Sequence, residues 1–274
     1  MRRFRFILLI TLMIGGLLTS ASYLFLQVYG ADIKQAVVRS LNKHLNTKVE
    51  TERIALDLWG QFPDVAVTFT NVRMHSALPD TPRYLARFHK VQAVVSPLSV
   101  VWGPYTIRRF ELSEGRVNPQ VNQDYQANYH VLKPSKQTDT TESSGPALNV
   151  NNITLRNIDI AYHNQPQEER YHLLAQNLTL SGKLRQERFT LQAKGKALIK
   201  TIQIADQTYA SNKPLALETR MAVNSAEGQY KLKQGLLTLA GADFQINGSA
   251  ARRSKGINLN LSLSSKDNDL KTLL

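Results

Sequence analysis

The sequence predicts a mainly β protein that an N-terminal helix holds in a membrane. Three observations carry this prediction: an uncharged apolar run near the N-terminus, a helical apolar period directly after it, and alternating apolar and polar residues over most of the remaining chain. We therefore expect a transmembrane helix, a short amphipathic helix and then an antiparallel β meander. Such a meander can pack on a second sheet as a β-sandwich or curl into an open groove. Periodicity alone favours the sandwich.

The membrane span is expected between Phe6 and Val28, which contains no charged residue. About 20 residues of helix cross the hydrocarbon core of a bilayer. Arg2, Arg3 and Arg5 precede the run, and the first charge after it is Asp32. The positive-inside rule therefore predicts a single-pass anchor over residues 1–30, with the N-terminus cytoplasmic and the bulk of the chain exported.

A cleaved signal peptide is the competing interpretation of this segment. The small residues from Thr19 to Ser22 are typical of a cleavage region. Apolar residues resume from Tyr23 to Leu26, however, and lengthen the run to a full span. We therefore favour retention, and both interpretations export the rest of the chain.

Composition limits the chemistry of the exported part. The 274 residues contain no cysteine, so disulfides, thiolate nucleophiles and cysteine-ligated metals are excluded. The formal net charge of +13 is spread along the chain and not gathered into basic tracts. No nucleic-acid-binding pattern accompanies it, so we expect no nucleic-acid partner. Attraction to anionic lipid headgroups is a better use for this charge.

The apolar pattern of the first exported segment changes twice, once in period and once in parity. Apolar residues recur at helical spacing from Ala31 to Asn46, and from Val49 the period is two. Val65 to Phe69 alternate, whereas Val72 and Met74 follow on the other parity. This change predicts a bulge near Asn71.

A polar segment from Lys133 to Pro146 has no apolar period and ends in Gly-Pro. We expect residues 133–146 to be a linker between a first β module over residues 31–132 and a second over residues 147–274. The second module alternates most regularly. Its glycines are expected near hairpin turns, namely Gly182, Gly195, Gly228, Gly241, Gly248 and Gly256.

Seven stretches beyond the anchor follow strand-and-turn patterns in a characteristic order, namely Thr51–Leu56, Phe62–Val67, Asn71–Arg73, Val91–Glu111, Asp124–Tyr129, Ile153–Tyr162 and Leu237–Gly248. Together with the anchor, they resemble the AsmA-like family of bacterial envelope proteins. Tyr125 stands where the family usually has glycine. Members are usually longer, so we expect the second module to continue in a longer protein. The family resembles groove-shaped lipid-transfer proteins, and the resemblance shifts our expectation from the sandwich to the curved open groove.

The resemblance implies a bacterial inner-membrane protein whose bulk is periplasmic. It implies support of outer-membrane assembly and lipid homeostasis, with phospholipid or another membrane lipid bound or conducted in an apolar groove. Envelope proteins are further possible partners. The candidate groove-lining residues are Leu217, Met221, Val223, Phe244, Ile246, Leu259, Leu261 and Leu263. The alternative is a membrane-tethered β-sandwich that serves as an interaction scaffold without lipid transport.

No catalytic motif is present in the sequence. The nucleophile elbow, the phosphate-binding loop, the dinucleotide fingerprint and the zinc-protease helix are all missing. We therefore expect a non-enzymatic protein with no cofactor and no metal site. His163 and His172 flank a polar hairpin and are expected to be solvated.

Overall fold

A computed structural model describes residues 45–57, 64–78, 83–96, 107–131, 152–182, 188–224, 226–253 and 256–265. The expected anchor, residues 31–44 of the expected amphipathic helix and the linker over residues 133–146 lie outside the described residues. Within these ranges, no helix has the length and apolar character to cross a bilayer.

The described part of the chain is mainly β and contains no helix, as the alternating pattern predicts. The strands are β1 (Val49–Glu50), β2 (Arg53–Asp57), β3 (Val65–His75), β4 (Tyr84–Val95), β5 (Ile107–Val117), β6 (Gln120–Val121), β7 (Asn152–Asn164), β8 (Glu169–Ser181), β9 (Arg188–Ile204), β10 (Gln207–Asn224), β11 (Gln229–Leu239), β12 (Ala242–Arg253) and β13 (Gly256–Ser264).

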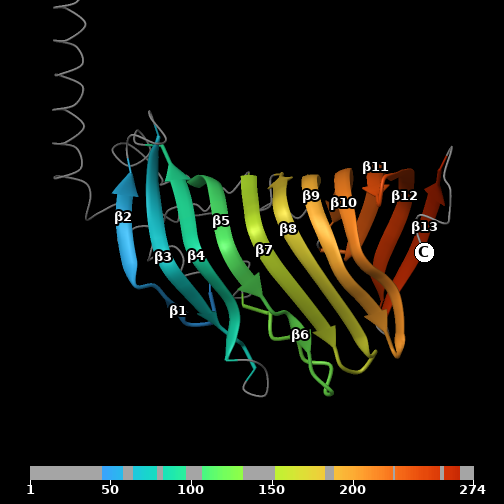
Figure 1. Cartoon of the computed structure of the whole chain (residues 1–274), viewed down its shortest axis with the longest axis horizontal. Coiled ribbons are helices and arrows are strands. Elements are labelled where there is room, and N and C mark those ends of the chain that lie inside the picture. Colours follow the sequence, from blue (N-terminus) through green and yellow to red (C-terminus); the bar gives the residue numbers. More distant parts are fainter. Residues whose placement is uncertain are drawn as a thin grey trace, which may run out of the picture.

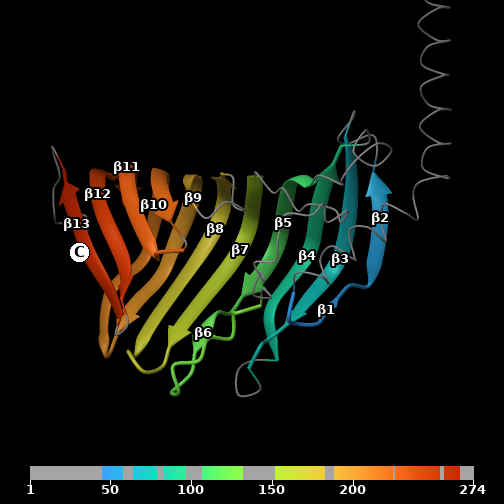
Figure 2. The same cartoon turned by 180° about the vertical axis from the view of Figure 1, so that it is seen from behind.

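All of these strands belong to one open sheet with the order β1-β3-β4-β5-β7-β8-β9-β10-β11-β12-β13. β2 pairs with β3 beside β1, and β6 pairs with β7. Figures 1 and 2 show the strands side by side, from β2 at one end to β13 at the other, in a sheet that bends along its length. The described strands therefore do not form the two packed sheets of a sandwich.

The pairing is antiparallel throughout β7 to β13, as expected for the second half of the chain. The expectation of an entirely antiparallel meander is wrong at one place, because β5 and β6 both pair with β7 in parallel. Parallel neighbours need a connection of a dozen or more residues. The segment between Val131 and Asn152, which includes the expected linker, is long enough to provide it. Strands from both sides of that linker thus share one sheet.

A row of left-handed residues, which we call the crease, crosses β3, β5 and β7. Asn71, Glu114 and Asn157 have φ values of 52°, 51° and 52°, in the left-handed region. These three residues lie at the same level of the sheet. On one side of them is the row of directly paired residues that contains Thr70, and on the other side is the row that contains Val72. The bulge predicted near Asn71 is wrong, because Thr70–Lys90 and Val72–Phe88 pair in one register, although the change of parity itself is real. The cause of this change is a left-handed residue, since the register shift between β3 and β4 falls further on, between Met74 and His75.

Two of the glycines expected at turns lie inside strands instead. Gly195 is in β9 and Gly248 is in β12, whereas Gly228 and Gly241 do occupy turns. A Cβ at residue 195 would lie 2.0 Å from the carbonyl oxygen of Asn177, and one at residue 248 would lie 2.2 Å from that of Asn260. These glycines therefore permit a close approach of neighbouring strands, which alternation alone does not reveal.

The hydrophobic core lies at the β3–β5 end of the sheet. Val65, Val67, Phe69, Ala93 and Val95 are buried there, and Ile158 and Ala175 extend the same cluster into β7 and β8. Among the side chains that the structure describes, none from β11 or β13 joins this cluster. The two ends of the sheet are thus packed very differently.

Candidate functional site

One face of the sheet is apolar along its whole length. Directly paired residues of neighbouring strands point to the same face. A first row crosses ten strands through Ile54, Phe69, Val91, Leu112, Leu155, Leu178, Gly195, Leu217, Leu237 and Phe244. A second row, beyond the crease, runs through Val72, Phe88, Gly115, Ile158, Ala175, Ala197, Leu215, Leu239 and Ala242. We call this surface the apolar face.

The crease is what keeps this face continuous. Phe69 and Val72 both belong to the core although they differ in parity. In the same way, Ile158 belongs to the core and Leu155 packs against it, although these two residues also differ in parity. A left-handed residue between the members of each pair reverses the alternation. Asparagine tolerates this conformation better than most residues, which explains its place at 71 and 157.

The structure places all eight candidate lining residues on the apolar face. Leu217 is in the first row with Phe244, through Leu237. Met221 pairs with Leu232 and Val223 with Tyr230. Ile246 lies two residues after Phe244 and so on the same face of β12. Leu263, Leu261 and Leu259 lie on this face because they pair with Ile246, Gly248 and Ala250 of β12. The sequence interpretation thus selected residues that share one surface.

Exposure of the apolar face rises toward β13. Val65 and Val67 are 0% exposed, whereas Leu259, Leu261 and Leu263 are 60%, 49% and 59% exposed. Between these ends, Leu217, Met221, Phe244 and Ile246 are half-buried, and Val223 is buried. The apolar face therefore changes from a protein core to a surface open to solvent or to a ligand.

The opposite face is polar. It carries a shallow hollow of ≈ 670 Å³ over β8 to β11, with Lys194, Lys196, Glu218, Arg220 and Gln234 in its lining. Lys194 Nζ lies 2.8 Å from Glu218 Oε2, and both side chains are largely exposed. Contact with such a polar and charged lining would not stabilise an acyl chain, so the hollow is not a candidate site for lipid tails.

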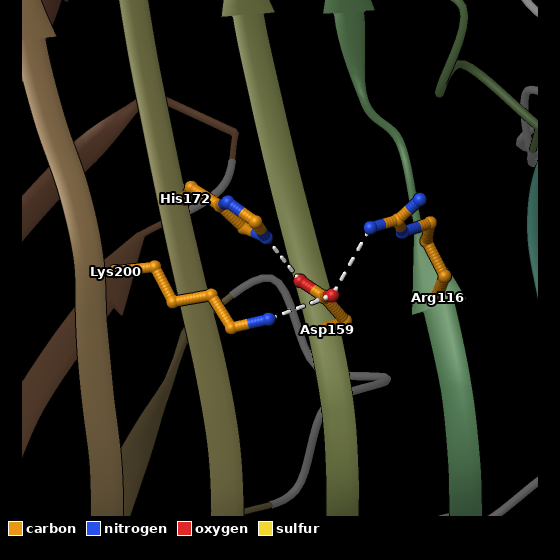
Figure 3. A network of polar contacts seen from close by, with 4 residues as sticks. All are labelled: Arg116, Asp159, His172 and Lys200. Carbon is orange, nitrogen blue, oxygen red and sulfur yellow. Dashed lines mark hydrogen bonds and ion pairs between the residues drawn. The ribbon is translucent and has the colours of Figure 1, made fainter. Parts of the chain in front are cut away.

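A carboxylate on the polar face joins four strands (Figure 3). Asp159 in β7 accepts from Arg116 Nη2 of β5 at 3.2 Å and from Lys200 Nζ of β9 at 3.0 Å. His172 Nε2 of β8 contacts its other carboxylate oxygen. Asp159 lies between Ile158 and Ile160 in sequence, so alternation places it opposite the apolar face.

The pKa of Asp159 is held below its usual value. Burial opposes ionisation of this 18%-exposed carboxylate, but the hydrogen bonds from Lys200 and His172, the charge of His172 and the hydrogen bond from Arg116 outweigh that effect. An ionised carboxylate with three nitrogen partners has little capacity left to accept a proton or a metal. The arrangement instead ties β5, β7, β8 and β9 together.

The two histidines expected to be solvated are both half-buried. His172 is 32% exposed and contacts Asp159, and burial together with the charge of Arg170 lowers the pKa of His163. No local pattern predicts the Asp159 cluster, because the three partners of Asp159 lie 13 to 43 residues away from it in the chain. Only the register of four strands brings them together.

The segment that resembles the family's Asp-Gly signature forms a tight turn. Tyr125, at the glycine position, has φ 60° and is exposed. Asn122 Oδ1 accepts from the backbone N–H groups of Asp124 and Gln126, at 3.1 Å and 2.8 Å. The turn thus keeps the left-handed residue that glycine normally supplies.

Asn128, in the same segment, is 0% exposed. Its Oδ1 accepts from Gln120 N at 2.8 Å, and its Nδ2 donates to Asn118 O at 3.1 Å. Its role is therefore structural, because it satisfies the backbone where the chain leaves β5 and enters β6.

Within the described ranges, no three histidine or acidic side chains gather where they would hold a metal ion. No protein-family model matches the chain, and no curated protein matches its sequence.

Proposed function

We propose that this chain is an AsmA-like, non-enzymatic protein of the bacterial inner membrane. In this proposal a single span anchors it with the N-terminus in the cytoplasm, and the sheet lies in the periplasm. There it binds or conducts phospholipid along the apolar face and so supports outer-membrane assembly and lipid homeostasis. The curved sheet acts as an open groove, and the anchor holds it beside a source of lipid.

The observation that carries this proposal is the exposure of an apolar face that is continuous with the core. Leu259, Leu261 and Leu263 leave large aliphatic side chains open on that face. Contiguous exposed apolar surface marks a site for an apolar ligand or a partner. Each CH₂ group of an acyl chain that leaves water for such a surface contributes about 0.8 kcal/mol.

The character of the polar face also supports lipid binding on the apolar face alone. Its exposed Lys194, Lys196 and Arg220 keep that side of the sheet hydrated. Acyl chains would therefore be confined to one face, while headgroups stay in water at its margin. No covalent step and no cofactor are needed for this activity.

Photo-crosslinking on the two faces tests the proposal. A photoreactive amino acid replaces Leu217 or Met221 on the apolar face, and Leu236 on the polar face serves as the matched control in the full chain in membranes. We expect phospholipid adducts, detected by mass spectrometry, from positions 217 and 221 but not from 236. Absence of adducts from both apolar positions, together with no co-purified phospholipid, would contradict the proposal and favour the tethered scaffold.

A further inference from the structure

Three arginines lie side by side on the polar face. Arg73 in β3 pairs directly with Arg87 in β4, and Arg87 pairs directly with Arg116 in β5. Directly paired residues point to the same face, with their Cβ atoms about 5 Å apart. We call these three residues the arginine row. Like charges in such positions destabilise a sheet, so the stability of the fold does not account for this row.

Carboxylates lie at the two ends of the arginine row. Arg73 Nη2 is 2.7 Å from Glu52 Oε1, and Arg116 Nη2 is 3.2 Å from Asp159 Oδ2 (Figure 3). The middle residue, Arg87, is exposed, and no acidic side chain among the described residues lies within ion-pair distance of it. The guanidinium at the centre of the row is therefore available to an anion from outside the chain.

Two further carboxylates lie near the row without neutralising its centre. Glu50 is directly paired with Arg73, but its carboxylate contacts Lys48 at 2.7 Å and His75 at 3.2 Å instead. Glu114 lies in the crease, and within the described part of the chain no ion pair joins it to the row. The negative charges are thus placed around the row and not over its middle.

We propose that the arginine row binds the phosphate groups of anionic phospholipid headgroups, at the surface of the membrane in which the chain is anchored. A guanidinium can donate two parallel hydrogen bonds to one phosphate, which suits arginine to this group. Lys90, three residues after Arg87 in β4, adds a second cation that has no ion pair with another described residue. The inference rests on the membrane anchor of the proposed function, but not on lipid binding by the apolar face.

The arginine row lies near one margin of the sheet. Arg73 is two residues before the end of β3, Arg116 is one residue before the end of β5, and Arg87 is three residues after the start of β4. A membrane surface can therefore contact the row at this margin while the apolar face stays open.

The path of the chain favours a membrane headgroup over an anion in solution. β1 pairs with β3 through Glu50 and Arg73, so the chain enters the sheet beside the arginine row. Residues 29–44 separate the expected span from the first described residue. A helix of that length is about 24 Å long. Tethering over so short a distance raises the effective concentration of headgroup phosphates at the row, an advantage that a soluble anion or an acidic protein lacks.

Phosphorus NMR of the full chain in lipid nanodiscs tests the docking. A nitroxide is attached to His89→Cys, which is the only cysteine in that variant and replaces an exposed residue two positions from Arg87. Ser249→Cys, exposed on the polar face of β12, carries the same label as the control. With equal parts of phosphatidylcholine and phosphatidylglycerol, we expect the label at 89 to broaden the lipid phosphorus signals more than the label at 249. Equal broadening from both positions, or equal broadening from 89 in pure phosphatidylcholine, overturns the inference.

Arg87→Gln in the His89→Cys background shows whether the arginine itself is responsible. The ratio of docked to undocked chain should fall roughly fivefold, the contribution of one basic residue at an anionic surface. Arg220→Gln is the matched control, because Arg220 is an exposed arginine of the polar face that also has no ion pair with another described residue. An equal loss from both substitutions would reflect net charge alone and overturns the inference.

Two further measurements separate this inference from its alternatives. Inorganic phosphate at the concentration of the phosphatidylglycerol, with ionic strength held constant, should leave the broadening unchanged; its loss would identify free phosphate as the ligand and overturn the headgroup assignment. Arg87→Gln should not lower the thermal unfolding midpoint in a neutral detergent, since it relieves repulsion within the row. A midpoint below that of Arg220→Gln would show that Arg87 is structural and overturns the inference.

Failure of the docking and failure of the lipid proposal are distinguishable. Lipid adducts from a photoreactive residue in place of Leu217 are expected in the Arg87→Gln chain as in the unsubstituted one. Adducts without excess broadening from position 89 contradict the docking alone, and broadening without adducts contradicts lipid binding by the apolar face alone. A chain that does not enter nanodiscs contradicts the anchor and overturns both.

Discussion

Lys200 Nζ lies 3.0 Å from Asp159 Oδ2, although β8 separates the strands that carry the two residues. The contact lies on the polar face and spans the distance from β7 across β8 to β9. The apolar rows lie on the opposite face of the same strands. A single carboxylate therefore links strands that share no backbone hydrogen bonds.

Asp159→Asn should destabilise the sheet by roughly 1–3 kcal/mol at pH 7, because it leaves Arg116, His172 and Lys200 without their anionic partner. The pKa of Asp159 is lowered from its usual 3.8, so the carboxylate contributes stability above that pH and loses it as the pH falls through the folded-state pKa. The difference in unfolding free energy between the wild type and the variant should thus shrink toward zero in acid. Urea unfolding followed by circular dichroism from pH 7 to pH 3 measures it; a difference independent of pH would contradict this account.

Asn128→Ala should cost roughly 1–3 kcal/mol of stability, because it removes two hydrogen bonds from a fully buried amide and leaves backbone groups of Gln120 and Asn118 unpaired. Asn247→Ala, on the exposed polar side of β12, is the control and should change stability by less than about 0.5 kcal/mol. Denaturant midpoints of the two variants make the comparison. Equal midpoints would show that Asn128 does not hold the turn.

Gly195→Ala should destabilise by roughly 2–4 kcal/mol, since the new Cβ would meet the carbonyl oxygen and the Cα of residues in β8 as well as strain the backbone at φ 157°. Gly241→Ala adds a Cβ with no atom within 4 Å, and only its φ of 88° opposes the change. We expect about 1 kcal/mol there. Thermal unfolding ranks the two variants, and a larger loss for Gly241→Ala would contradict the close strand approach.

Tyr162 stacks on Tyr171 with 5.7 Å between ring centroids, and burial, with the nearby Tyr129 and Glu169, raises the pKa of Tyr162 to about 12. A raised tyrosine pKa contributes stability that is complete below the usual 10.0 and is lost as the pH rises toward 12. In ultraviolet titration at 295 nm, Tyr162→Phe should therefore remove absorbance change from the latest part of the curve. Loss of an earlier-titrating phenol instead would contradict the burial of this ring.

Much of the fold was predictable from alternation, because a period of two assigns each residue to a face without knowledge of its neighbours. The eight lining candidates lie on one surface for this reason, and the parity change at Asn71 is visible in the sequence. The parallel pairing of β5 with β7 was not predictable, since it depends on where the chain returns after the 132–151 segment. Gly195 and Gly248 were misplaced because a glycine in a strand and a glycine in a turn look alike in one sequence.

The sequence by itself determined the strand content, the apolar and polar parities and the absence of cysteine chemistry, because each follows from local residue order and composition. Only the tertiary structure decided which strands are neighbours. That arrangement places Arg116, His172 and Lys200 around Asp159. It also leaves Leu261 exposed, whereas Val65 is buried in the core. The physical reason is that register and sheet order depend on contacts between residues far apart in the chain, which no local pattern encodes.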